Sequence, residues 1–177
     1  MTELDDLRYP IGKHDVRAPV SAGDLKAAIR DIRELPDHLA AAVAELNDKQ
    51  LDTTYRQGGW TVRQVVHHLP DSHVNAYVRF KLALTEDVPV IKTYDEERWA
   101  ELADARAFPI EPSLSLLRGL HARWASLLDG LGQAELQRGL MHPEAGKFSI
   151  AQLTGLYGWH GRHHVAHITS LRTRSGW

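Results

Sequence analysis

Four long segments of this 177-residue chain have apolar residues at the spacing of an amphipathic α-helix, and this pattern limits the possible folds more than any other feature. Three of the segments begin with Ser or Thr followed three residues later by an acid or an amide, which is the arrangement of a capping box. The pairs are Ser21 with Asp24, Thr61 with Gln64, and Ser149 with Gln152. Ser113 can cap the remaining segment. We expect helices at 21–46, 61–86, 113–129 and 149–173, and therefore an all-α four-helix bundle.

Two prolines lie inside these expected helices. Proline has no backbone N–H, so a proline in a helix interior removes one backbone hydrogen bond and costs about 3 kcal/mol unless packing compensates. Pro36 is expected to kink the first helix or split it in two, and Pro70 is expected to kink the second.

The segments between the helices show weaker patterns. Residues 1–20 have neither a helical nor a strand period and predict an extended N-terminal arm. The polar segment 47–60 predicts a loop, and 96–103 a short helix. The segment 139–147 predicts a small hairpin or an irregular loop before the last helix. We expect one domain over 1–177, since this length suits a single core.

The composition narrows the class of protein. Lys and Arg number 21 against 23 Asp and Glu, a net charge of −2, which gives no reason to expect a nucleic-acid partner. No apolar run approaches the roughly 20 residues that span a bilayer, and the start lacks the apolar segment of a signal peptide. The chain has no cysteine, which excludes disulfides and a protein thiol nucleophile. We expect a cytoplasmic protein without a membrane partner.

Histidine is the anomalous residue of this composition. The chain has 11, and seven of them fall in two short stretches on the second and fourth expected helices. These are His67, His68 and His73, and then His160, His163, His164 and His167. Side chains from facing helices build the metal and ligand sites of helical bundles, so this clustering is the main functional signal.

The helical period separates the histidines of the last helix. His164 lies near the centre of the apolar stripe and His160 close to it, so this i, i+4 pair points inward and can bind one ion. A bound metal would provide a partner for one ring nitrogen of each histidine. The alternative is that both are core histidines, each with its own hydrogen-bond partners. His163 lies toward the edge of the stripe. His167 is a supporting residue or pairs with His163 in an alternative site.

A third ligand must come from another helix. His67 and His68 diverge by about 100°, so one of them at most can face a given site. Ser72, Asn75 and Arg79 lie on the same side of the helix as His68, and such a polar line favours a pocket wall at His68. A solvated helix face explains the same line equally well.

The motif around His160 is not the complete motif of a zinc protease. His160 and His164 have the spacing of an HExxH motif, but Gly161 stands where those enzymes have the glutamate that acts as general base. Three histidines leave coordination positions open, as in catalytic zinc sites. With no adjacent base, the ion itself would have to activate the nucleophile.

Two segments carry a resemblance to a known family: GGWTVRQVVHHLPDSHVNAYVRFKL at 58–82 and LYGWHGRHHVAHITSLRTRSGW at 156–177. With YPIG near the start, YDEERW at 94–99 and LHARWASLL at 120–128, the chain resembles the DinB/YfiT superfamily over essentially its full length. It is most similar to the YfiT branch, which is described as metal-dependent hydrolases and includes bacillithiol S-transferases.

The resemblance implies a four-helix bundle with a divalent ion bound by three histidines. The first follows the tryptophan of the GGW segment by eight residues and corresponds to His68. The other two are the ends of an HxxxH motif on the last helix and correspond to His160 and His164. Zinc or nickel is the usual ion, water fills the open positions, and homodimers are common. Pro70 departs from the alanine of close relatives and, two residues after His68, can displace that ligand.

The resemblance also implies the chemistry. The first reading is a metal-dependent enzyme that activates a low-molecular-weight thiol, bacillithiol, for S-transfer to an electrophilic small molecule in detoxification or stress response. The second reading is a hydrolase that activates water on an unknown substrate. The third is a non-catalytic, metal-stabilised dimer in a stress response. We prefer the transferase because no protein base is evident beside the ligands.

Five further residues are candidates for the second layer or the pocket: Asn75, Arg79, Arg162, His163 and His167. The two arginines can bind the carboxylates of the thiol, although solvated surface arginines fit the same spacing.

Overall fold

Each predicted capping box forms at the N-terminus of a long helix in the computed structural model, which describes residues 3–177. Ser21 caps α2 (Ala22–Val43), Thr61 caps α4 (Val62–Thr85) and Ser149 caps α9 (Ile150–Ser175). In each case the cap hydroxyl accepts a hydrogen bond from the backbone N–H three residues later. The side chain of that later residue accepts a hydrogen bond from the backbone N–H of the cap residue. The predicted all-α four-helix bundle is confirmed.

The remaining long helix, α7 (Glu111–Asp129), begins two residues before the predicted Ser113. Pro112 stands in its first turn, where a missing N–H costs nothing. The prolines at 36 and 70 lie within α2 and α4 without ending them, so the split considered at Pro36 does not occur. Burial of both prolines lets tertiary packing offset the lost backbone bonds.

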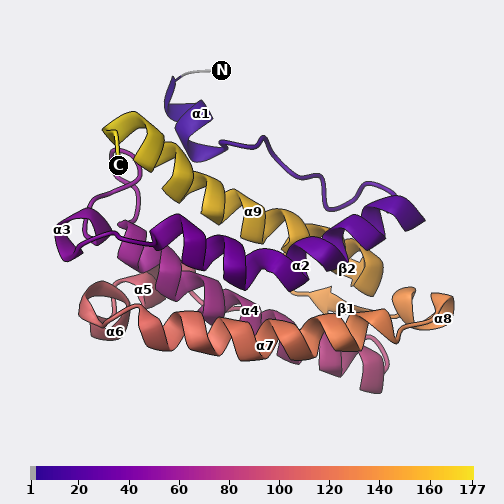
Figure 1. Cartoon of the computed structure of the whole chain (residues 1–177). Coiled ribbons are helices and arrows are strands. Elements are labelled where there is room, and N and C mark those ends of the chain that lie inside the picture. Colours follow the sequence, from indigo (N-terminus) through magenta and orange to yellow (C-terminus); the bar gives the residue numbers. More distant parts are fainter. Residues whose placement is uncertain (1–2) are drawn as a thin grey trace.

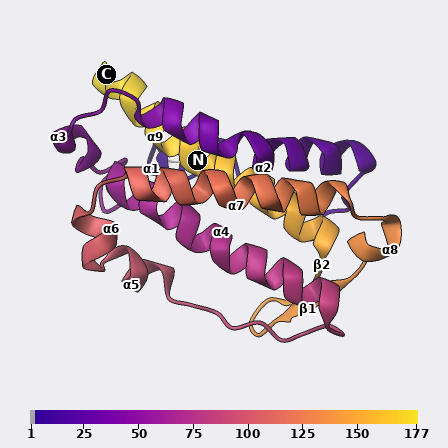
Figure 2. The same cartoon turned by 60° about the horizontal axis from the view of Figure 1, so that its bottom comes forward.

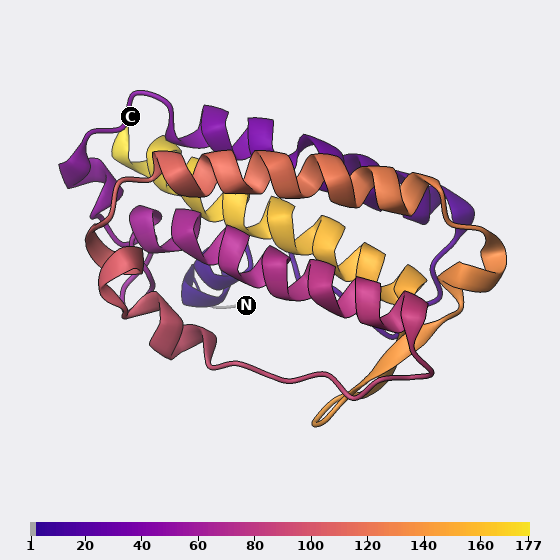
Figure 3. The ribbon, with the colours of Figure 1, turned by 90° about the horizontal axis from the view of Figure 1, so that it is seen from below.

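The four long helices form a bundle in which α2 packs against α9 and α7, and α4 packs against the same two helices from the other side. The segment 86–110 travels back along the length of the bundle before α7 begins (Figure 3). As a result α4 and α7 run in the same direction, opposite to α2 and α9 (Figures 1 and 2). This order makes α4 and α9, which carry both histidine stretches, direct neighbours.

The shorter elements correct several expectations. The arm has neither helix nor strand between residues 9 and 21 and contains two turns, but Glu3–Arg8 forms helix α1; residues 1 and 2 lie outside the described part. A helix of six residues is too short to show a period. The expected loop 47–60 contains α3 (Asp48–Leu51), and the expected helix 96–103 is α5 (Glu96–Ala100), followed by α6 (Ala103–Ala107). After α8 (Gln133–Leu136), β1 (Gly139–His142) and β2 (Gly146–Ser149) pair antiparallel, which confirms the hairpin alternative.

The core consists of two apolar clusters with a layer of buried histidines between them. One cluster is built around Leu39, Leu69 and Leu117, and the other around Phe80 and Trp124. His73 follows Leu69 by one turn on α4, and His121 follows Leu117 by one turn on α7; both are fully buried. The apolar helix faces are used in this core, and no helix in the described range 3–177 is long and apolar enough to cross a membrane.

Two glycines let α9 approach α2 closely. A Cβ atom added to Gly158 would lie 2.9 Å from the Cα atom of Ala28, and one added to Gly161 would lie 2.6 Å from a methyl group of Leu35. Both distances are shorter than non-bonded carbon atoms tolerate, so the packing of these helices requires glycine.

Candidate metal centre

Three histidines converge where α4 and α9 pack together. His68 comes from α4, and His160 and His164 come from successive turns of α9. One nitrogen of each ring belongs to a set in which all three atoms lie within 4.8 Å of one another. The Nε2 atoms of His68 and His160 are 3.4 Å apart. The structure thus brings together the three residues that the sequence and the resemblance predict as ligands.

The spacing and protonation of these rings fit a divalent ion. Zn–N bonds of about 2.0–2.1 Å in a tetrahedral site place two ligand nitrogens about 3.4 Å apart, as His68 and His160 are. Burial lowers the pKa of His68 to about 4 and those of His160 and His164 well below the usual range. The rings are therefore neutral at physiological pH, and each has a lone pair available for a metal.

The ligands form one wall of a cavity of about 310 Å³ that opens to solvent. The Trp60 ring lies 4.7 Å from the His68 ring and 6.3 Å from the His164 ring, which places an aromatic wall over two ligands. Two arginines and two glutamates also line the cavity: Arg8, Arg56, Glu96 and Glu97. The cavity can therefore admit a small molecule with both apolar and charged parts.

His163 and His167 line the same cavity one layer out from the ligands. The His163 ring stacks on Trp159 with centroids 4.5 Å apart, and the His167 ring stacks on Tyr55 at 4.0 Å. The Nε2 atom of His167 donates to the carbonyl of Arg8 at 3.2 Å, which fixes the end of α1 over the cavity. Burial lowers the pKa of both rings to about 4. The expectation of pocket positions for these two histidines agrees with the cavity lining.

His67 points away from the cavity, as its angle to His68 on the helix requires. Its Nδ1 atom lies 2.8 Å from the hydroxyl of Ser113, and its Nε2 atom donates to the carbonyl of Phe108 at 3.1 Å. His67 thus holds the start of α7 and the preceding loop against α4.

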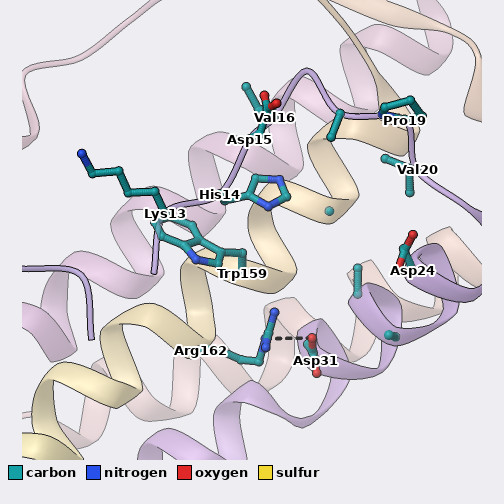
Figure 4. A pocket seen from close by; sticks show the side chains of 14 residues that line it. Lys13, His14, Asp15, Val16, Pro19, Val20, Asp24, Asp31, Trp159 and Arg162 are labelled. Atoms are coloured by element: carbon teal, nitrogen blue, oxygen red, sulfur yellow. Dashed lines mark ion pairs between the residues drawn. The ribbon is translucent and has the colours of Figure 1, made fainter. Parts of the chain in front are cut away.

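The structure does not bring Asn75, Arg79 or Arg162 to this cavity. None of the three belongs to the described residues that line it. The Asn75 amide donates to the carbonyl of Asp71, and Arg79 donates to the carbonyl of Lys92, each at 2.8 Å. Arg162 forms a 3.0 Å ion pair with Asp31 in a separate cavity of about 330 Å³ beneath the N-terminal arm (Figure 4). The helix phase gives the direction of each side chain but does not show whether that side chain reaches this cavity.

Behind the ligands, two histidines that the sequence analysis gave no role form a hydrogen-bonded chain. The Nε2 atom of His73 lies 3.0 Å from Nδ1 of His160, and Nδ1 of His73 lies 2.8 Å from Nε2 of His121. Nδ1 of His121 in turn donates to the carbonyl of Ile32 on α2. His121 could have been found from the apolar stripe of α7, where it stands between Leu117 and Trp124 as a polar residue facing the core.

The cavity also contains residues for which the sequence has no local signal. Arg8, Tyr9, Tyr55 and Arg56 come from the end of α1 and from the loop before α4. A helical period cannot place loop residues, so these positions follow from the tertiary fold alone.

Comparison with known proteins agrees with this geometry. The family model described as DinB superfamily matches residues 31–168. A Geobacillus thermodenitrificans protein named "Putative metal-dependent hydrolase" is 56% identical over 179 aligned positions that cover 100% of both chains. A Bacillus cereus protein with the same name is 53% identical over 98% of this chain and 100% of its own.

The fold matches a solved structure equally well. The structure described as "YfiT from Bacillus subtilis is a probable metal-dependent hydrolase with an unusual four-helix bundle topology" superposes with a TM-score of 0.94. The two chains are 48% identical, and the match covers 97% of this chain and 99% of the other. The matched family model, the full-length relatives and the shared bundle lead to one conclusion: this chain belongs to the DinB superfamily.

Proposed function

We propose that this protein is a metal-dependent enzyme in which His68, His160 and His164 bind one divalent ion, zinc or nickel, for thiol S-transfer. The observation that carries the proposal is the convergence of three neutral imidazoles on the wall of a solvent-accessible cavity. Imidazole nitrogens suit zinc and nickel, and three protein ligands leave a position open, which is typical of catalytic sites. A divalent ion held there supplies Lewis acidity, which lowers the pKa of a thiol or a water molecule.

The charges around the cavity support a thiol that carries carboxylates, such as bacillithiol. Arg8 and Arg56 line the cavity, and guanidinium groups bind carboxylates through paired hydrogen bonds. Arg56 uses Nη1 to donate to the carbonyl of Gln57, and its buried Nε has no hydrogen-bond partner in the described structure. A buried donor without a partner favours an acceptor group from a ligand. The aromatic wall of Trp60 can pack against the electrophile.

Hydrolysis is the second candidate, and a separate observation favours it. Glu96 lines the cavity, and its pKa is raised by burial and by its neighbours Glu97 and Asp95. A carboxylate with a raised pKa can accept a proton from a water molecule near neutral pH. The names of the relatives agree with this candidate.

One assay separates the two candidates. Zinc- or nickel-loaded protein is incubated with bacillithiol and a chlorinated aromatic or maleimide-type probe, and thiol conjugation is followed against a metal-free sample. Conjugation that depends on the metal supports S-transfer, and an absorption change of the cobalt-substituted protein on adding the thiol supports thiol binding at the site. Metal-dependent ester or amide cleavage without conjugation would support the hydrolase instead. Metal binding with neither activity would overturn both and favour a metal-stabilised structural protein.

A further inference from the structure

The starting point is a backbone carbonyl that Pro36 leaves without its helical partner. In an α-helix the carbonyl of residue i accepts from the N–H of residue i+4. For Ile32 on α2 that residue is Pro36, which has no N–H. The carbonyl of Ile32 instead accepts a hydrogen bond from Nδ1 of His121, a ring that is fully buried on α7. The proline that lowers the helix propensity of α2 thus provides a buried acceptor on its inner face.

This acceptor fixes the position of the proton on His121. A carbonyl oxygen can only accept, so Nδ1 of His121 must carry the proton. In a neutral imidazole the other nitrogen is then an acceptor. The hydrogen-bond partners of His121 among the described residues are the Ile32 carbonyl and the ring of His73, and neither is a counter-charge that would favour the imidazolium form.

The same reasoning continues through the next two rings. Nδ1 of His73 lies 2.8 Å from the accepting Nε2 of His121, so it must donate, and Nε2 of His73 becomes an acceptor. Nδ1 of His160 lies 3.0 Å from that acceptor and must donate in turn. The unprotonated nitrogen of His160 is therefore Nε2, which is the atom that lies 3.4 Å from Nε2 of His68.

We propose that the hydrogen-bonded chain from the Ile32 carbonyl through His121 and His73 positions His160 for metal binding by fixing its Nδ1–H tautomer. The proposal rests on the proposed metal centre, but the tautomer itself is a property of the metal-free protein. The chain joins one group from each long helix, α2, α7, α4 and α9, so it also holds the His160 ring in place relative to the whole bundle. His73 and His121 are positioning residues that act through His160.

The direct test is the tautomer of His160 in metal-free protein. Protein labelled with ¹⁵N in histidine is examined by long-range ¹H–¹⁵N correlation, which distinguishes protonated from unprotonated ring nitrogens. We expect Nδ1 of His160, His73 and His121 to be protonated and Nε2 of each to be unprotonated, with one tautomer populated. A wild-type His160 protonated at Nε2 would overturn the proposal, whatever the enzymatic activity turns out to be.

Matched variants at position 121 test whether the chain causes the tautomer. His121→Phe keeps a buried ring but can neither donate nor accept. His121→Gln retains both functions in one amide, which can donate to Ile32 and accept from His73. We expect His121→Phe to populate both tautomers of His160 and to weaken zinc binding about 10–100-fold, the usual effect of losing an outer hydrogen bond to a ligand. His121→Gln is expected to restore the single tautomer and most of the affinity.

The outcomes separate this proposal from the proposed function. His38 is exposed on α2, and His38→Phe is the control that should change neither the tautomer nor the affinity. If His121→Phe folds, as judged by its circular dichroism, and retains one His160 tautomer, the proposal is wrong. If His121→Phe does not fold, His73→Phe provides the same test, because a phenyl ring cannot accept a hydrogen bond from Nδ1 of His160. An altered tautomer with unchanged zinc affinity would show that the chain does not position the ligand, and would also contradict the proposal.

Discussion

The Nε2 atom of His68 on α4 lies 3.4 Å from the Nε2 atom of His160 on α9, although 92 residues separate them in the chain. Two neutral imidazole nitrogens at this distance can share one hydrogen bond, or both can bind one cation when neither carries a proton. The contact depends on how α4 and α9 pack, so the metal centre and the bundle form together. Changes in packing and in protonation should therefore both be measurable at this site.

Acidification should destabilise the metal-free protein over a defined range. An unfolded chain protonates histidine near its ordinary pKa of 6.5, whereas burial lowers the pKa of folded His68 and His121 to about 4. Between these values the unfolded state binds more protons, so the free energy of unfolding falls as the pH is lowered from about 7 to 4. Urea unfolding at pH 7.5, 6.0 and 5.0 measures this slope. The dependence of the free energy of unfolding on pH should be weaker in His121→Phe and unchanged in His38→Ala. Equal slopes in the wild type and both variants would contradict the lowered pKa of His121.

Close packing of α9 on α2 predicts opposite effects for two glycine substitutions. Gly158→Ala would place a Cβ atom 2.9 Å from the Cα atom of Ala28. We therefore expect overpacking to lower the free energy of unfolding by about 1–3 kcal/mol. Gly119→Ala on α7 meets no atom within 4 Å and should gain up to about 1 kcal/mol from higher helix propensity. Thermal or urea unfolding of both variants at pH 7.5 tests this, and a stabilising Gly158→Ala would show that the helices are not in close contact.

Substitution of Arg56 should weaken binding of the thiol substrate and leave metal binding unchanged. If its guanidinium binds a carboxylate of the thiol, Arg56→Gln loses a charge-assisted hydrogen bond of about 1.5–3 kcal/mol, which corresponds to a roughly 10–100-fold rise in KM for bacillithiol. Metal stoichiometry should stay unchanged, because Arg56 lines the cavity without being one of the ligands. Arg30→Gln, an exposed position on α2 outside the cavity, is the matched control. An unchanged KM for Arg56→Gln would remove the charge argument for a carboxylate-bearing thiol.

Bound metal should stabilise the fold by mass action. An ion at 100 times its dissociation constant adds about 2.7 kcal/mol if the unfolded chain does not bind it. For a chain of this size that corresponds to a rise in Tm of about 5–10 °C. Differential scanning calorimetry with and without zinc should show this rise for the wild type and not for His160→Ala. A rise of the same size in His160→Ala would place the ion elsewhere.

The sequence predicts the long helices well because their signals are local. Capping boxes at Ser21, Thr61 and Ser149 fix three helix starts, and the helical period identifies His160 and His164 as neighbours on one inward face. The period of α4 could not decide between His67 and His68, since apolar residues surround that helix. The resemblance favoured His68, and the structure places that ring at the cavity while His67 binds Ser113 and Phe108.

The rest of the site depends on contacts between distant segments. Arg162 has a helix phase close to the ligands, yet an ion pair with Asp31 holds it in the cavity under the arm (Figure 4). Arg8 and Arg56 reach the metal cavity from segments without a period. From the sequence, Pro36 predicts only a kink or break in its helix. That it leaves the Ile32 carbonyl available to His121 becomes visible only when α7 is packed against α2.

Metal content tests the central claim most directly. Untagged wild-type protein and the variants His68→Ala, His164→Ala and His163→Ala are reconstituted with zinc, dialysed and analysed by plasma mass spectrometry. We expect about one ion per chain in the wild type and in His163→Ala, and almost none in the other two, because the ligand atoms belong to His68, His160 and His164. A wild type that retains no ion after reconstitution, or a loss of the ion in His163→Ala, would contradict the three-histidine centre.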